Sequence, residues 1–84
     1  MEFAQALEHL KSKDAKTRYE AVLFLARYPK TDDWETSCDR VFELTEDKHP
    51  RVRSAAGIAA SMINARNSVF NLPVPDFLQE WDEA

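Results

Sequence analysis

Apolar residues recur at three- and four-residue steps in four successive stretches of the chain. This spacing places side chains on one face of an α-helix and therefore predicts a helix in each stretch. The predicted helices cover residues 2–11, 15–28, 32–46 and 50–66. Pro29 ends the second helix because the residue before a proline avoids the helical conformation, and Pro50 suits the first turn of the fourth. Asp14 is placed to cap the second helix, and Thr31 or Asp32 the third.

The second and fourth helices are predicted to be covered on more than one side. The second helix carries apolar residues on opposite faces between Tyr19 and Tyr28. In the fourth, the face opposite the apolar stripe bears the small residues Ser54, Gly57 and Ser61, with Ile58 beside them. This row is either a place where a neighbouring backbone packs closely or a solvated face, and both interpretations stay open. The third helix has one predicted apolar stripe, made of Trp34, Cys38, Val41, Phe42 and Thr45.

The last 18 residues, 67–84, contain a predicted extended connector with two prolines, followed by a short fifth helix that carries Phe77, Leu78 and Trp81. Large apolar residues are too frequent here for a free tail. We expect this segment to fold back over the exposed flank of the fourth helix.

A shift of 35 residues superposes the first two predicted helices on the next two without a gap. The shift pairs Arg18 with Arg53 and Ala21 with Ala56, and elsewhere it mostly pairs apolar with apolar positions. A period in this range is typical of stacked helical hairpins. The arginines can pair with carboxylates or carbonyls of an adjacent turn, so their first expected role is to hold the stack together.

The segment DKHPRVRSAA, residues 47–56, resembles the HEAT and HEAT-like repeat family, whose repeats place an Asp-rich turn before a Val-Arg pair and a small residue. The matching residues are Asp47, Pro50, Val52, Arg53 and Ala56. The first repeat fits less closely, with Ala15 in place of Pro and Thr17 in place of Val. The resemblance implies an all-α fold of two stacked antiparallel helical hairpins in a right-handed α-α superhelix, plus a short C-terminal capping helix. Repeat one then covers residues 2–30, repeat two 31–66 and the cap 67–84 of a single domain.

Charge is segregated along the 84 residues, although the net charge is only −4. The net charges of residues 1–30, 31–47, 48–66 and 67–84 are +2, −6, +4 and −4. An acidic total disfavours general nucleic-acid binding, since phosphate neutralisation needs an excess of Lys and Arg. A lone cysteine, the lack of an apolar run of about 20 residues and the lack of a signal-peptide pattern favour a cytoplasmic protein that does not span a membrane.

The sequence offers no set of residues for catalysis, and we expect neither an enzyme nor a cofactor or metal site. His9, His49 and Cys38 lack the spacing of metal ligands. Cys38 falls on the predicted apolar stripe, and the single glycine, Gly57, excludes a glycine-rich phosphate loop.

Two charged surfaces are the candidate binding sites. The first is a basic ridge on the two equivalent turns, formed by Lys13, Lys16, Lys48 and Arg51. The second is an acidic strip on the third helix, formed by Asp32, Asp33, Glu35, Asp39 and Glu43. We expect a non-catalytic module that docks to another protein. The alternative is a small acidic inhibitor, such as a toxin-immunity protein or a phage-encoded antagonist, that blocks a basic nucleic-acid-binding site. Two repeats are short for such a stack, so the C-terminal segment, a second copy of the chain or a partner is expected to cover it.

Overall fold

The computed structural model describes residues 1–27 and 34–68, and this part of the chain is all-helical. It contains α1 (Phe3–His9), α2 (Ala15–Arg27), α3 (Trp34–Glu43), the 3₁₀ turn η1 (Leu44–Glu46) and α4 (Pro50–Ser68). The prediction of an all-α chain with four helices in this region is confirmed. The predicted starts of the second and fourth helices are also confirmed. α4 continues to Ser68, two residues into the predicted connector, and the rest of the predicted connector and cap lies outside the described residues.

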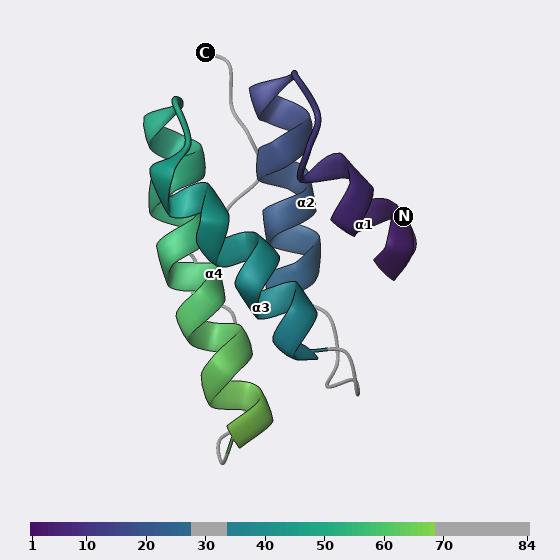
Figure 1. Ribbon diagram of the computed structural model, residues 1–84, viewed down its shortest axis with the longest axis vertical. Coiled ribbons are helices and arrows are strands. Elements are labelled where there is room, and N and C mark those ends of the chain that lie inside the picture. The colour runs from purple at the N-terminus through teal and green to yellow at the C-terminus, as the bar shows by residue number, and fades with distance from the viewer. Residues whose placement is uncertain (28–33, 69–84) are drawn as a thin grey trace.

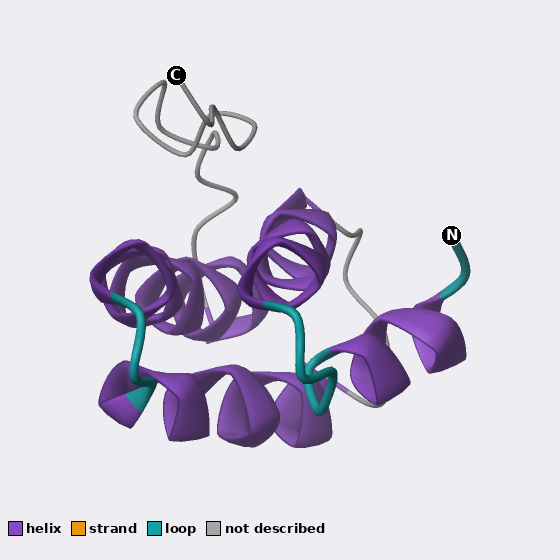
Figure 2. Ribbon diagram, turned by 90° about the horizontal axis from the view of Figure 1, so that it is seen from above, coloured by secondary structure: helices purple, strands orange, loops and turns teal. Residues whose placement is uncertain are grey.

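The helices form two pairs that meet through α2 and α4 (Figure 1). α1 packs on α2, and α3 packs obliquely across α4. α2 and α4 lie side by side and run in the same direction, so both begin at the same end of the molecule. Seen along these two helices, α1 and α3 lie together on one side of the layer that α2 and α4 form (Figure 2). This arrangement brings the α1–α2 turn next to the turn that precedes α4.

The core lies between the helices of this layer and the two that cover it. Its largest fully buried side chains are Leu25 and Val22 of α2, Val41 of α3 and Val52 of α4. Short side chains fill much of the remainder, and the fully buried alanines are Ala6, Ala21, Ala26, Ala56 and Ala59. Because the separation of packed helices follows the size of the side chains between them, these alanines permit the helices to approach closely.

The structure decides two expectations about helix faces, one for Phe42 in α3 and one for Gly57 in α4. Phe42, predicted for the apolar stripe of the third helix, is 62% exposed, so this placement is wrong. Its neighbour Val41 takes the core position, and consecutive helical residues point about 100° apart, so Phe42 turns to the surface. At Gly57, an added Cβ would meet no atom within 4 Å, so among the described residues no backbone packs there. The solvated-face interpretation of Ser54, Gly57 and Ser61 is the one that the described structure supports.

Candidate functional site

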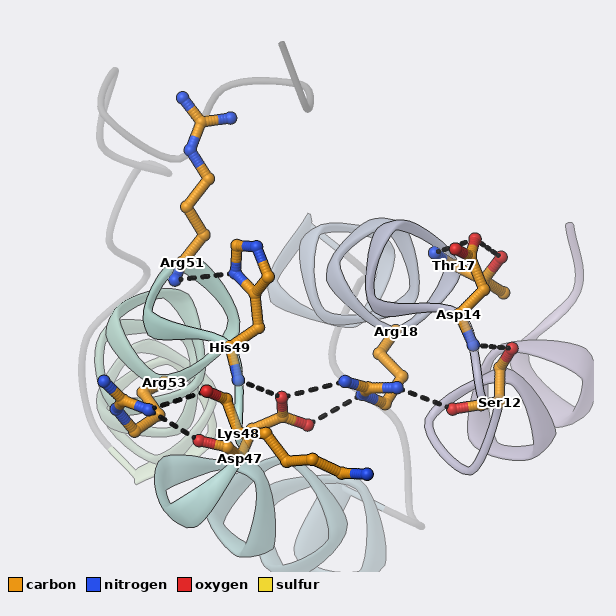
Figure 3. Close-up of polar contacts among 9 residues, drawn as sticks. All are labelled: Ser12, Asp14, Thr17, Arg18, Asp47, Lys48, His49, Arg51 and Arg53. Carbon is orange, nitrogen blue, oxygen red and sulfur yellow. Dashed lines mark hydrogen bonds and ion pairs between the residues drawn. The ribbon is translucent and has the colours of Figure 1, made fainter. Parts of the chain in front are cut away.

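Two turns lie together at one end of the molecule, and we call them the paired-turn end (residues 12–18 and 47–53; Figure 3). Each turn leads into one of the two parallel helices, α2 or α4. The candidate site is built from the polar groups that shape these turns and from the cations that the turns carry.

In the first turn, short polar side chains satisfy the free N–H groups at the start of α2. Ser12 Oγ accepts a hydrogen bond of 3.1 Å from the Asp14 N–H. Asp14 Oδ2 accepts from the N–H of Thr17 at 3.1 Å and from its hydroxyl at 2.8 Å, which makes Asp14 the predicted cap of the helix. The hydrogen bond from the Thr17 hydroxyl, followed by that from its N–H, lowers the pKa of Asp14. The carboxylate is therefore ionised and engaged within its own turn.

The second turn repeats this construction 35 residues later. Asp47 Oδ1 accepts a hydrogen bond of 2.9 Å from the His49 N–H, as Ser12 accepts from Asp14. His49 Nδ1 then accepts from the Arg51 N–H at 3.2 Å at the start of α4. The two turns thus share a hydrogen-bonding pattern as well as a sequence period.

A buried ion pair joins the two turns. Arg18 of α2 donates from Nε to Asp47 Oδ2 at 2.7 Å and from Nη2 to Asp47 Oδ1 at 2.9 Å. Its Nη1 donates to the Ser12 carbonyl at 2.9 Å, so one guanidinium binds both turns. The side chains are only 10% and 6% exposed, and a two-pronged contact of this kind is stronger and more directional than a single hydrogen bond. The prediction that an arginine pairs with the carboxylate of an adjacent turn is confirmed for Arg18.

The pKa of Asp47 reflects opposing influences. Burial, the largest of them, acts to raise it. The hydrogen bonds from Arg18 and from the His49 N–H, together with the charge of Arg18, outweigh burial and hold the pKa of Asp47 below its ordinary value. The ion pair is therefore fully formed at neutral pH.

Arg53 holds the corresponding place in the second turn. Its Nη1 donates to the Asp47 carbonyl at 2.9 Å and to the Lys48 carbonyl at 3.0 Å. The Arg18 contact with Ser12 and the Arg53 contact with Asp47 both span six residues. Unlike Arg18, Arg53 is exposed, on the side of its turn that faces away from Arg18 (Figure 3).

The predicted basic residues gather around this pair of turns. Lys13, Lys48 and Arg51 are exposed and Lys16 is half-buried, all within the two turns that Arg18 joins. Together, the two turns contain six basic side chains and two carboxylates. Arg18 neutralises Asp47, and the exposed Asp14 is outnumbered by four exposed cations, so the net exposed charge of the paired-turn end is positive. The four cations are Lys13, Lys48, Arg51 and Arg53.

The acidic strip lies on a different element. Glu35 and Asp39 are exposed on α3, whereas the predicted members Asp32 and Asp33 lie outside the described residues. Phe42, with Glu43 next to it, is exposed on the same helix. The sequence pattern assigned Phe42 to the core, and the missed signal is that Val41 beside it already continues the stripe of Cys38 and Trp34.

Cys38 does not have the features of a nucleophile. Its thiol is half-buried and donates to the Ala60 carbonyl at 3.5 Å. Burial and then the nearby Asp39 raise the pKa of Cys38, which keeps the thiol protonated at neutral pH.

Within residues 1–27 and 34–68, no cluster of three or more His, Cys, Asp or Glu side chains is arranged to hold a metal ion. None of the helices in that part of the chain combines the length and apolar character needed to cross a bilayer. Comparisons of the chain with protein-family models, with curated proteins and with solved structures found no match.

Proposed function

We propose that this protein is a non-catalytic binding module of HEAT-like architecture that docks to an acidic surface of another protein through the paired-turn end. The observation that carries the proposal is the Arg18–Asp47 ion pair, which fixes two cationic turns beside each other. Because the two turns are already fixed relative to each other, binding through them costs less loop-ordering entropy than binding through independent loops.

The repeated hydrogen bonds support the HEAT-like part of the proposal. The contacts from Ser12 to Asp14 and from Arg18 to Ser12 recur 35 residues later. The parallel course of α2 and α4 agrees with hairpins stacked in register. A right-handed superhelix of two such repeats follows as the proposed architecture.

Charge balance supports a protein partner over a nucleic acid. The chain is acidic overall, and Glu35 and Asp39 add exposed negative charge on α3. A nucleic acid would be repelled by this background, whereas an acidic patch on a protein needs only the local cations. A protein patch is therefore the proposed target.

Affinity capture with two charge-neutralised variants tests the proposal. The basic-turn variant carries Lys13→Gln, Lys16→Gln, Lys48→Gln and Arg51→Gln, and the control carries Glu35→Gln, Asp39→Asn and Glu43→Gln on α3. A purified partner, identified by quantitative mass spectrometry of captured proteins, is then titrated by calorimetry. The basic-turn variant is expected to bind about tenfold more weakly or worse, because four rim charges are lost, while the control binds as the wild type does. Unchanged binding of the basic-turn variant, or capture that nuclease treatment abolishes, contradicts the proposal.

The exposed Phe42 favours one alternative function. An aromatic side chain that is 62% exposed on a helix with Glu35, Asp39 and Glu43 is suited to enter an apolar pocket with a basic rim. The protein would then be an acidic inhibitor of a basic nucleic-acid-binding protein. In the same assay this alternative requires Phe42→Ala and the α3 control variant to lose binding while the basic-turn variant keeps it.

A further inference from the structure

Arg53 makes half of the set of contacts that Arg18 makes in full, and within the described residues the full set occurs once. Both arginines use Nη1 to bind a carbonyl six residues earlier in their own turn. Arg18 then uses Nε and Nη2 to hold the carboxylate of Asp47 in the next turn. Among the described residues, the Nε and Nη2 groups of Arg53 donate to no acceptor, and the side chain is exposed. The edge that binds a carboxylate in Arg18 is therefore open in Arg53.

The flank of α4 next to Arg53 is also more exposed than the equivalent flank of α2. Five α2 residues are buried, whereas the α4 residues 35 positions later are exposed or half-buried. The α2 residues are Arg18, Tyr19, Val22, Leu23 and Ala26, and their α4 counterparts are Arg53, Ser54, Gly57, Ile58 and Ser61. α2 has α4 as its neighbour, and the space at Gly57 is open. Within residues 1–27 and 34–68, no helix covers the outer flank of α4, which in this part of the chain can receive another helix of a hairpin as α2 receives α4.

We infer that Arg53 is the partner-recognition residue of the paired-turn end, and that it binds an aspartate in the loop directly before a helix of a partner's helical hairpin. This inference rests on the proposed docking function and specifies its partner. The Arg18–Asp47 pair supplies the template, because its carboxylate also lies in the turn before a helix. The cationic excess of the two turns favours the same acidic ligand.

A second copy of this chain does not supply that carboxylate in the same register. The corresponding turn of its first hairpin offers Ser12 in place of Asp47, and its own Asp47 is already held by Arg18. In this register, the partner is accordingly a different protein.

Nuclear magnetic resonance titration tests the inference with the full-length, ¹⁵N-labelled protein and a defined ligand. The ligand is a peptide of residues 34–66 from this chain, which presents Asp47 before a helix without its Arg18. Addition of the peptide is expected to shift the Arg53 Nε–H signal and to slow its exchange with water. A peptide with Asp47→Asn is expected to bind at least about tenfold more weakly, because the two-pronged, charge-assisted contact is lost.

Matched protein variants separate geometry from charge. Arg53→Lys keeps the positive charge but loses the planar edge, so it is expected to weaken peptide binding by about tenfold. Lys48→Gln removes a neighbouring charge and is expected to change binding by about twofold or less. Equal effects of Arg53→Lys and Lys48→Gln overturn the inference.

A tethered form excludes failure from a poorly folded peptide. The same 34–66 segment is joined to the C-terminus of the full chain by a flexible linker, which raises its effective concentration to about the millimolar range. Coupling between Arg53→Gln in the chain and Asp47→Asn in the appended segment is expected in a double-mutant cycle of urea unfolding. The inference is overturned if the tethered form shows no coupling and the free peptide does not bind. It is also overturned if a single-stranded oligonucleotide shifts the Arg53 Nε–H signal more than the peptide does. If a natural partner still depends on Lys13, Lys16, Lys48 and Arg51, only the role of Arg53 fails and the proposed function stands.

Discussion

Replacing Asp47 by asparagine removes the charge of the ion pair while it keeps the shape of the side chain. Arg18 would remain in a site where its side chain is only 10% exposed, without an anionic partner. Removing one partner of a buried ion pair costs about 3–5 kcal/mol of stability. The amide oxygen of asparagine can still accept a hydrogen bond from Arg18, so we expect Asp47→Asn to lie at the lower end of this range, at about 3 kcal/mol. A chain of this size has a free energy of unfolding of about 4–13 kcal/mol, so the loss is a large fraction of the total.

Urea unfolding followed by circular dichroism measures this loss, and the melting temperature is expected to fall by about 12–24 °C. Arg18→Gln should cost a similar amount, and the double variant less than the sum, with a coupling energy of about 1–3 kcal/mol. Glu43→Gln is the matched control, because Arg40 and Glu43 form an exposed pair at 3.8 Å. Its expected effect is about 0.5 kcal/mol or less.

The same pair has a defined pH dependence. Because the folded-state pKa of Asp47 is lowered, its contribution to stability is complete above the unfolded pKa of about 3.9 and is lost as pH falls through the folded pKa. The stability difference between wild type and Asp47→Asn should therefore shrink below about pH 4. An additive double-mutant cycle, or a difference that does not change on acidification, would refute the role assigned to the ion pair.

Three further predictions concern single sites. Gly57→Ala should stabilise the protein by about 0.5–1 kcal/mol in urea unfolding, since the added methyl meets open space in a helix interior; destabilisation would contradict the described flank. Cys38 should react with iodoacetamide more slowly at pH 7 than it does in guanidinium, because burial raises its pKa, and equal rates would show that the thiol is not shielded. Asp14→Ala should destabilise the protein while Asp14→Ser retains most of the stability, because serine also caps a helix by accepting from the Thr17 N–H; equal losses would argue against the cap.

The elements of the fold were accessible to sequence reasoning because their signals are local. Asp14 and Pro50 mark the starts of α2 and α4 through the hydrogen-bonding needs of a first helical turn. The position of Phe42 was not accessible in this way. Val41 and Phe42 are both compatible with a stripe at three- and four-residue steps, and only the packing of α3 on α4 decides which of them is buried.

The candidate site was predicted in part. Placing Lys13 and Lys48 in equivalent turns followed from the 35-residue period, and the structure brings those turns together. The sequence did not identify Asp47 as the partner of Arg18. In the first repeat the position equivalent to Asp47 is Ser12, which has no charge, so the 35-residue period shows no aspartate that recurs in both turns. The pairing of Arg18 with Asp47 depends on how α2 lies against α4, which the periodicity of one helix does not specify.

The paired-turn end depends most on Arg18, which joins the two turns into one surface. The hydrogen exchange rate of its Nε–H group, measured by nuclear magnetic resonance at neutral pH, tests this contact directly. We predict slow exchange for Arg18 relative to the exposed Arg40, and loss of the protection in Asp47→Asn. Exchange of Arg18 as fast as that of Arg40 in the wild-type protein would contradict the account.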